Sequence, residues 1–67
     1  MIWYQVQFLD LRDSWEAYGE ACPTLQLAEK KYLTFILLYK EDADCKALRI
    51  VAVRNLLVLE VLQYRDF

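Results

Sequence analysis

The segment TLQLAEKKYLTFILLY, residues 24–39, has the clearest structural pattern in the 67-residue chain. On a helical wheel of 100° per residue, six of its apolar side chains share an arc of about 100° over roughly four and a half turns. Thr24 is a favourable N-cap for such a helix, and Cys22-Pro23 interrupts the preceding segment. We therefore predict a helix after Thr24 that buries one stripe, made of Leu25, Ala28, Tyr32, Phe35, Ile36 and Tyr39.

The residues before the helix predict a β-hairpin. Residues 2–9 alternate, with Ile2, Tyr4, Val6 and Phe8 on one face and Trp3, Gln5, Gln7 and Leu9 on the other. This period of two is typical of a half-buried strand. A polar loop at residues 10–14 then leads to a second strand over residues 15–21. Gly19 weakens that strand or marks a bulge.

The residues after the helix predict two further strands. Residues 48–53, LRIVAV, are rich in β-branched side chains, and Arg54-Asn55 can form a two-residue turn because Asn tolerates a positive φ. Residues 56–64 then form the last strand, with Leu56, Val58, Glu60, Leu62 and Tyr64 on one face. A helix over the same residues is the alternative, because Asn55 can cap a helix and Leu, Glu and Gln favour one.

The predicted order is strand, strand, helix, strand, strand. We expect one small α+β domain over residues 1–67, a ββαββ fold in which a single helix packs on a small antiparallel sheet. If Tyr4, Val6 and Phe8 point toward the helix, Trp3 and Leu9 lie on the other face of the sheet.

The chain has more apolar side chains than a small core can hide. Apolar residues make up 58% of it, whereas a domain of this size buries only about 60% of its unfolded surface. Four helix leucines also lie outside the predicted stripe. We therefore expect a contact surface for a second copy, another protein or both, and we assign to it Trp3, Leu27, Leu33, Leu37, Leu38, Leu57 and Leu59.

Several kinds of chemistry are absent from the sequence. The chain has no histidine, which removes the imidazole base and His-containing metal sites, and its one glycine excludes a glycine-rich phosphate loop. We expect no catalytic residues, no metal and no cofactor. A net charge of −2 without a basic stripe argues against a nucleic-acid partner. The acidic group Glu41, Asp42 and Asp44 lacks the spacing of a calcium loop, and we interpret it as a solvated loop.

The two cysteines and the N-terminal residues indicate the cellular compartment that we expect. Cys22 and Cys45 lack the CxxC spacing of zinc or redox sites, so we interpret them as structural thiols. The N-terminus lacks the charged and apolar regions of a secretory signal, and no apolar run is long enough for a membrane span. These features favour a cytoplasmic protein with reduced thiols and no membrane partner.

The layout resembles small ββαβ-type accessory proteins of phages and mobile elements. The resemblance rests on Trp3-Tyr4-Gln5-Val6, on Ser14-Trp15 at the hairpin, on residues 24–29 opening the helix and on residues 48–53 as the next strand. It covers most of the first 53 residues, and the apolar segment 56–62 departs from the usual polar ending. The resemblance implies a protein that binds and modulates a host protein, including inhibitors of bacterial defence systems.

We expect a small non-enzymatic protein-binding or regulatory module, oligomeric and acting through an apolar helix or sheet surface. One alternative is a structural homo-oligomer or a fixed small subunit of a larger assembly. Another is an oligomeric binder of a nucleotide-like ligand, with Tyr and Trp as stacking walls and Arg49 or Arg54 as the anion-binding residue.

Overall fold

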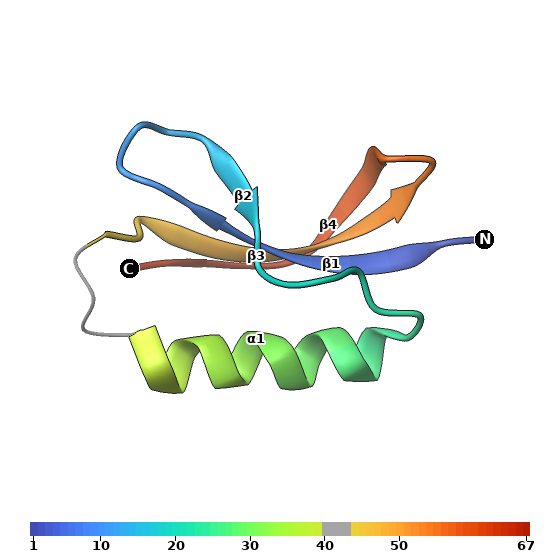
Figure 1. Cartoon of the computed structure of the whole chain (residues 1–67), viewed down its shortest axis with the longest axis horizontal. Helices are drawn as coiled ribbons and strands as arrows, with labels where there is room; N and C mark the ends of the chain where they lie inside the picture. Colours follow the sequence, from blue (N-terminus) through green and yellow to red (C-terminus); the bar gives the residue numbers. More distant parts are fainter. Residues whose placement is uncertain (40–43) are drawn as a thin grey trace.

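The computed structural model describes residues 1–39 and 44–67. Its elements are β1 (Trp3–Leu9), β2 (Trp15–Ala17), α1 (Leu25–Tyr39), β3 (Ala47–Arg54) and β4 (Leu57–Asp66). The strands form one antiparallel sheet in the order β2-β1-β3-β4, and α1 covers one of its faces (Figure 1). The predicted ββαββ order is confirmed, and the last element is a strand and not a helix.

The helix begins and packs as its sequence predicts. The N–H of Leu27 donates to Oγ1 of Thr24 at 3.3 Å, so Thr24 is the N-cap. Ala28, Tyr32 and Phe35 are buried against the sheet, and Leu25 and Ile36 are half-buried beside them. The side chain of Tyr39, the last member of the predicted stripe, lies outside the described residues.

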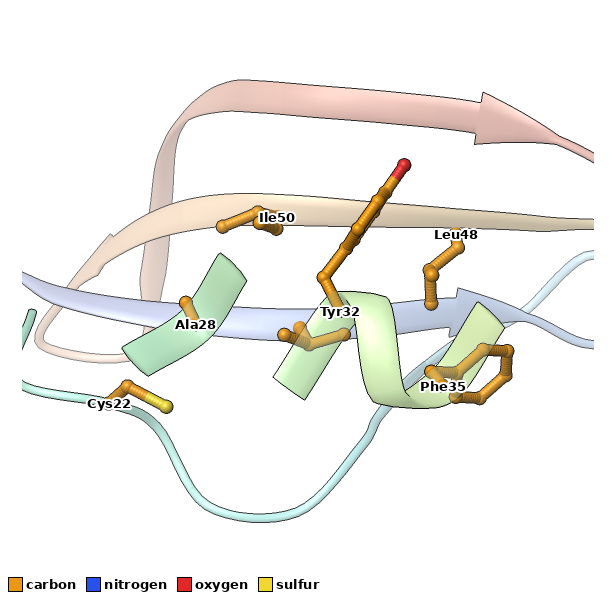
Figure 2. Packing of buried hydrophobic residues seen from close by; sticks show 7 residues of the cluster. Cys22, Ala28, Tyr32, Phe35, Leu48 and Ile50 are labelled. Atoms are coloured by element: carbon orange, nitrogen blue, oxygen red, sulfur yellow. The ribbon is translucent and has the colours of Figure 1, made fainter. Parts of the chain in front are cut away.

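The core lies between α1 and the two central strands. Val6, Leu48 and Ile50 are fully buried on the sheet side. The buried residues of α1 and Cys22 pack against them (Figure 2). Tyr4 and Phe8 pack against the same cluster, as the alternation of residues 2–9 predicts. Phe67 stacks on Phe35 with ring centroids 6.3 Å apart, so the C-terminal residue also packs beneath the sheet.

The second strand is shorter than the sequence predicts. The sequence predicts a strand over residues 15–21, but β2 ends at Ala17, and Gly19 has a φ of +73°. This left-handed conformation, which glycine adopts readily, breaks the extended pairing with β1. The chain returns to β1 only at an isolated bridge between Cys22 and Tyr4.

The turn between β3 and β4 is one residue later than predicted. Its two central residues are Asn55 and Leu56, not Arg54 and Asn55, and their φ angles are +51° and +65°. Two positive φ angles are typical of a type I′ turn, whose twist matches that of the strands. Leu56 therefore occupies a conformation that ordinarily favours glycine.

Two bulges in β4 change which of its side chains share a face. The pairing with β3 shifts between Ile50 and Val51 and again between Ala52 and Val53, which leaves Leu62 and Leu59 as extra residues. The predicted strict alternation over residues 56–64 is therefore wrong. By the observed register, Glu60, Gln63 and Arg65 lie on the helix side, whereas Val58, Val61 and Tyr64 lie on the opposite face.

Candidate functional site

The face of the sheet that is turned away from α1, here called the open face, has no second layer in the described part of the chain. The register and the pleat assign strand residues to it. They are Trp3, Gln5, Gln7 and Leu9 on β1, Trp15 and Ala17 on β2, Ala47, Arg49, Val51 and Val53 on β3, and Val58, Val61, Tyr64 and Asp66 on β4. Trp3 and Leu9 thus lie where the sequence predicts.

The open face is concave. Figure 1 shows the two hairpins curving away from α1 at opposite ends of the sheet. Trp15 on β2 and Tyr64 on β4 touch edge to face, with ring centroids 6.2 Å apart. In a flat sheet these strands would be about 14 Å apart, since neighbouring strands are separated by about 4.8 Å. Curvature also explains why Val51 is fully buried, although the described residues place no second layer on this face.

A cluster contributed by all four strands occupies the middle of this face. Gln7, Arg49 and Tyr64 form one row of cross-strand neighbours on β1, β3 and β4. Arg49 Nε donates to Oε1 of Gln7 at 2.8 Å, and Arg49 Cζ lies 3.9 Å from the centroid of the Trp15 ring. The guanidinium is therefore held by one hydrogen bond and one cation–π contact.

The electrostatics of the cluster follow from its burial and its few charges. Burial lowers the pKa of the Arg49 guanidinium from its ordinary value, although the group keeps its charge at neutral pH. Tyr64 donates its hydroxyl to Oδ1 of Asp66 at 2.7 Å, and this hydrogen bond raises the pKa of Tyr64. Among the strand residues of the open face, Arg49 and Asp66 are the charged ones. Arg49 is therefore the one cation of these strand residues, and its cross-strand neighbours are Gln7 and Tyr64.

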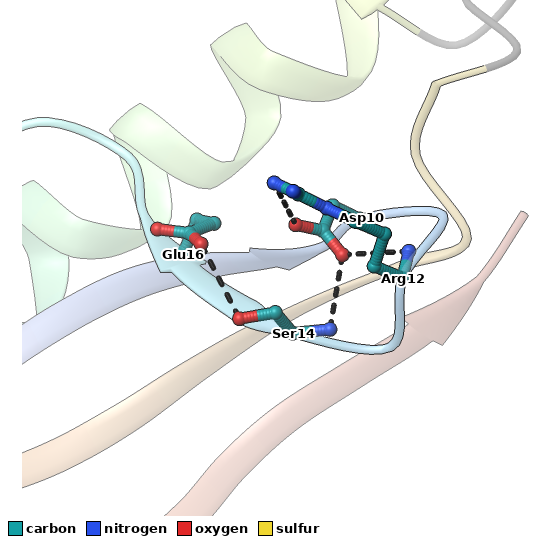
Figure 3. A network of polar contacts seen from close by, with 4 residues as sticks. All are labelled: Asp10, Arg12, Ser14 and Glu16. Carbon is teal, nitrogen blue, oxygen red and sulfur yellow. Dashed lines mark hydrogen bonds and ion pairs between the residues drawn. The ribbon is translucent and has the colours of Figure 1, made fainter.

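The loop between β1 and β2 places Trp15 over Arg49. Asp10 Oδ1 accepts the N–H groups of Arg12 at 2.8 Å and of Ser14 at 3.0 Å (Figure 3). The hydrogen bond from Ser14 is the main reason that the pKa of Asp10 is lowered. Lys46, the residue before β3, forms an ion pair with Asp13 at 2.8 Å. The hairpin loop is therefore held by hydrogen bonds within the loop and by an ion pair with the residue that precedes β3.

A shallow hollow of about 510 Å³ lies at one end of the open face, between the N-terminus and the turn after β3. Its walls include Trp3, Val53 and Leu56. Leu56 is 96% exposed at the tip of the turn. An apolar side chain of another molecule would fit beside these groups.

The predicted contact residues are all exposed, but they do not form one surface. Trp3 lies on the open face, on β1. Leu57 and Leu59 lie on β4, the edge strand that pairs with β3. The four helix leucines, Leu27, Leu33, Leu37 and Leu38, lie on α1, on the other side of the sheet.

The helix leucines are also divided among themselves. Leu33 and Leu37 are four residues apart and share one side of α1. Leu27 and Leu38 lie on a different side and are separated by about 16 Å along the axis. Lys30, Lys31 and Thr34 surround them, and Lys31 Nζ donates to the carbonyl of Glu20 at 2.9 Å. The helix surface therefore has small apolar patches and no continuous stripe.

The contact surface predicted from the sequence does not include Gln7, Trp15 or Tyr64. The nucleotide-binding alternative names Tyr and Trp as stacking residues with Arg49 or Arg54, and the structure places Arg49 against the ring of Trp15. The alternation in residues 2–9 puts Gln7 on the correct face, but the bulges in β4 hide the placement of Tyr64.

The described residues contain no group of three or more His, Cys, Asp or Glu side chains placed to hold a metal ion. Glu41 and Asp42 of the predicted acidic loop lie outside the described residues, and Asp44 is exposed. Cys22 is buried, Cys45 is half-buried, and neither forms a disulfide. Within residues 1–39 and 44–67, no helix has the length and apolar character needed to cross a membrane.

Comparison of the chain with protein-family models, with curated proteins and with solved structures found no match.

Proposed function

We propose that this chain is a small non-enzymatic module that binds another protein through its open face and the adjoining β4. The observation that carries the proposal is the exposure of β4: all ten of its residues are exposed, although most are apolar. Contiguous apolar surface of this kind marks interaction sites in small domains. The bulges support the same conclusion, because they gather Val58, Val61 and Tyr64 on the open face and place Glu60, Gln63 and Arg65 on the helix side.

The strained turn at Leu56 also supports a binding role. A leucine with a φ of +65° costs free energy that a glycine would avoid, and an almost fully exposed side chain recovers none of it by burial. Residues that adopt an unfavourable backbone conformation without compensating burial are frequent at functional sites. Leu56 projects beside Trp3, where it can contact a partner.

The resemblance to accessory proteins of phages and mobile elements narrows the proposed partners. On that basis the partner is a host protein, and an inhibitor of a bacterial defence protein is the regulatory role to examine first. This part of the proposal rests on the resemblance of residues 3–53 alone.

A selection from randomised peptides tests the proposal. Twelve-residue peptides presented by mRNA display would be selected on the immobilised chain and on two variants, Val58→Lys on the open face and Leu37→Lys on the helix. We expect the selected peptides to lose binding to Val58→Lys and to keep it with Leu37→Lys. Peptides that bind all three proteins equally, or no enrichment at all, would contradict the proposal.

A homo-oligomer is the second candidate, and the length of the edge strand favours it. β4 presents ten residues with an unpaired outer edge, and such edges pair with other chains. The two bulges limit this pairing, because they twist the strand and interrupt its regular hydrogen bonding. Native mass spectrometry at several concentrations distinguishes the candidates. The N–H of Phe67 donates to Lys46 at the start of β3, so by the alternation of an antiparallel ladder the N–H of Tyr64 points to the outer edge. A stable oligomer that Tyr64→Pro converts to a monomer, and that Tyr64→Ala does not, would favour self-association through β4.

A further inference from the structure

The terminal nitrogens of Arg49 have no hydrogen-bond acceptor or ion-pair partner among the described residues. Its Nε is used by Gln7, and the face of the guanidinium lies against Trp15. The ion pairs Arg12–Asp10 and Lys46–Asp13 lie elsewhere. Arg49 is half-buried, and Asp66, the acidic residue of the open face, accepts the hydroxyl of Tyr64 instead. The terminal nitrogens therefore face solvent as donors that a partner can use.

We propose that Arg49 binds the carboxylate of an acidic side chain that the partner protein presents to the open face. This inference rests on the proposed function and names the chemistry of the partner. With Nε engaged, Nη1 and Nη2 remain as a pair of parallel donors, which matches the two oxygens of a carboxylate. The contacts with Gln7 and Trp15 hold the guanidinium in place before the partner arrives, so less side-chain entropy is lost on binding.

The surroundings favour a single carboxylate over a phosphate or a nucleic acid. One guanidinium supplies the positive charge of the open face, in a chain whose net charge is −2. Binding to phosphates depends on several cations acting together, which the strand residues of this face do not supply. The neighbours Val51, Val61 and Tyr64 are apolar or aromatic. The site therefore fits an acidic residue that is flanked by apolar residues in the partner.

The fluorescence of Trp15 reports on this site directly, because its ring lies on the guanidinium. A Trp3→Phe background leaves Trp15 as the sole tryptophan of the chain. The probes are the peptide acetyl-Leu-Glu-Leu-amide, its isostere acetyl-Leu-Gln-Leu-amide, and inorganic phosphate. We expect the glutamyl peptide to bind about tenfold more tightly than the glutaminyl peptide, as one charge-assisted pair predicts.

Three variants identify the residue responsible. Arg49→Gln should abolish the preference for the glutamyl peptide, and Arg49→Lys should restore only part of it, because an ammonium lacks the planar pair of donors. Arg54→Gln removes the same charge from the end of the same strand and should leave the preference unchanged. Circular dichroism of each variant checks that the fold is retained. Equal affinities for the two peptides, no response to either, or an unchanged preference in Arg49→Gln would overturn the inference. A tighter response to phosphate than to the glutamyl peptide would also overturn it.

The peptide selection separates this inference from the proposed function. If the inference holds, selected peptides contain Glu or Asp between apolar residues and lose affinity for Arg49→Gln. Peptides that need Val58 but bind Arg49→Gln as well as the original chain would overturn the inference and leave the proposed function standing. If no peptide distinguishes the original chain from Val58→Lys, the proposed function itself fails.

Discussion

Replacing Leu56 by glycine should stabilise the protein, although it removes a large apolar side chain. Leu56 has a φ of +65° and is 96% exposed, so its side chain contributes almost no burial. A left-handed conformation costs a non-glycine residue about 1–2 kcal/mol. Glycine recovers this cost but adds roughly 0.5–1 kcal/mol of conformational entropy to the unfolded chain. We therefore expect the free energy of unfolding to rise by about 0.5–1 kcal/mol, since the first effect is the larger one.

Thermal and urea unfolding, followed by circular dichroism, measure this change. For a domain of this size the expected rise in Tm is roughly 3–6 °C. Leu56→Ala is the matched control, because alanine removes the bulk of the side chain but keeps the Cβ atom that opposes a positive φ. It should change the free energy of unfolding by less than about 0.5 kcal/mol. Measurements at several protein concentrations exclude a contribution from self-association.

The result that would refute this reasoning is a Leu56→Gly variant that is less stable than the original chain, or no more stable than Leu56→Ala. Either outcome would mean that Leu56 contributes packing or is not strained. The same variant should weaken the binding of selected peptides, because Leu56 lines the hollow beside Trp3. A gain in stability with a loss of binding would explain why a leucine occupies a position that favours glycine.

Three further predictions concern the core, the helix cap and the first hairpin. Leu48→Ala should lower the free energy of unfolding by about 2–5 kcal/mol, because Leu48 is fully buried, whereas Leu37→Ala on the exposed helix face should change it by less than about 0.5 kcal/mol in the same urea titration. Thr24→Ala removes the acceptor for the Leu27 N–H and should cost about 1 kcal/mol, and Thr24→Ser should recover most of the loss. The pKa of Asp10 is lowered in the folded state, so its carboxylate stabilises the fold above the unfolded value near 3.8, and the effect is lost as the pH falls through the folded pKa. Asp10→Ala should therefore be less stable than the original chain at pH 7, and this difference should shrink in thermal scans below pH 3.8; a difference that stays constant would contradict the role of the carboxylate.

The order of elements could be predicted from local patterns. The helix stripe, the Thr24 cap and the alternation in residues 2–9 depend on side chains close together in sequence, and each is found in the structure. The inward placement of Val6 and the outward placement of Trp3 follow from the same alternation. Such features are local because hydrogen bonding and steric preferences act over a few residues.

The composition of the open face could not be predicted in this way. A bulge depends on how two strands pair, so the sequence of β4 alone does not show that Glu60 and Gln63, three residues apart, share a face. The contact between Trp15 and Tyr64 needs a sheet that curves until its first and last strands approach each other. The Arg49 cluster likewise joins four strands that are distant in sequence. Local patterns specify the elements, whereas strand pairing and sheet curvature bring Gln7, Trp15, Arg49 and Tyr64 together, because these depend on long-range contacts that no short segment contains.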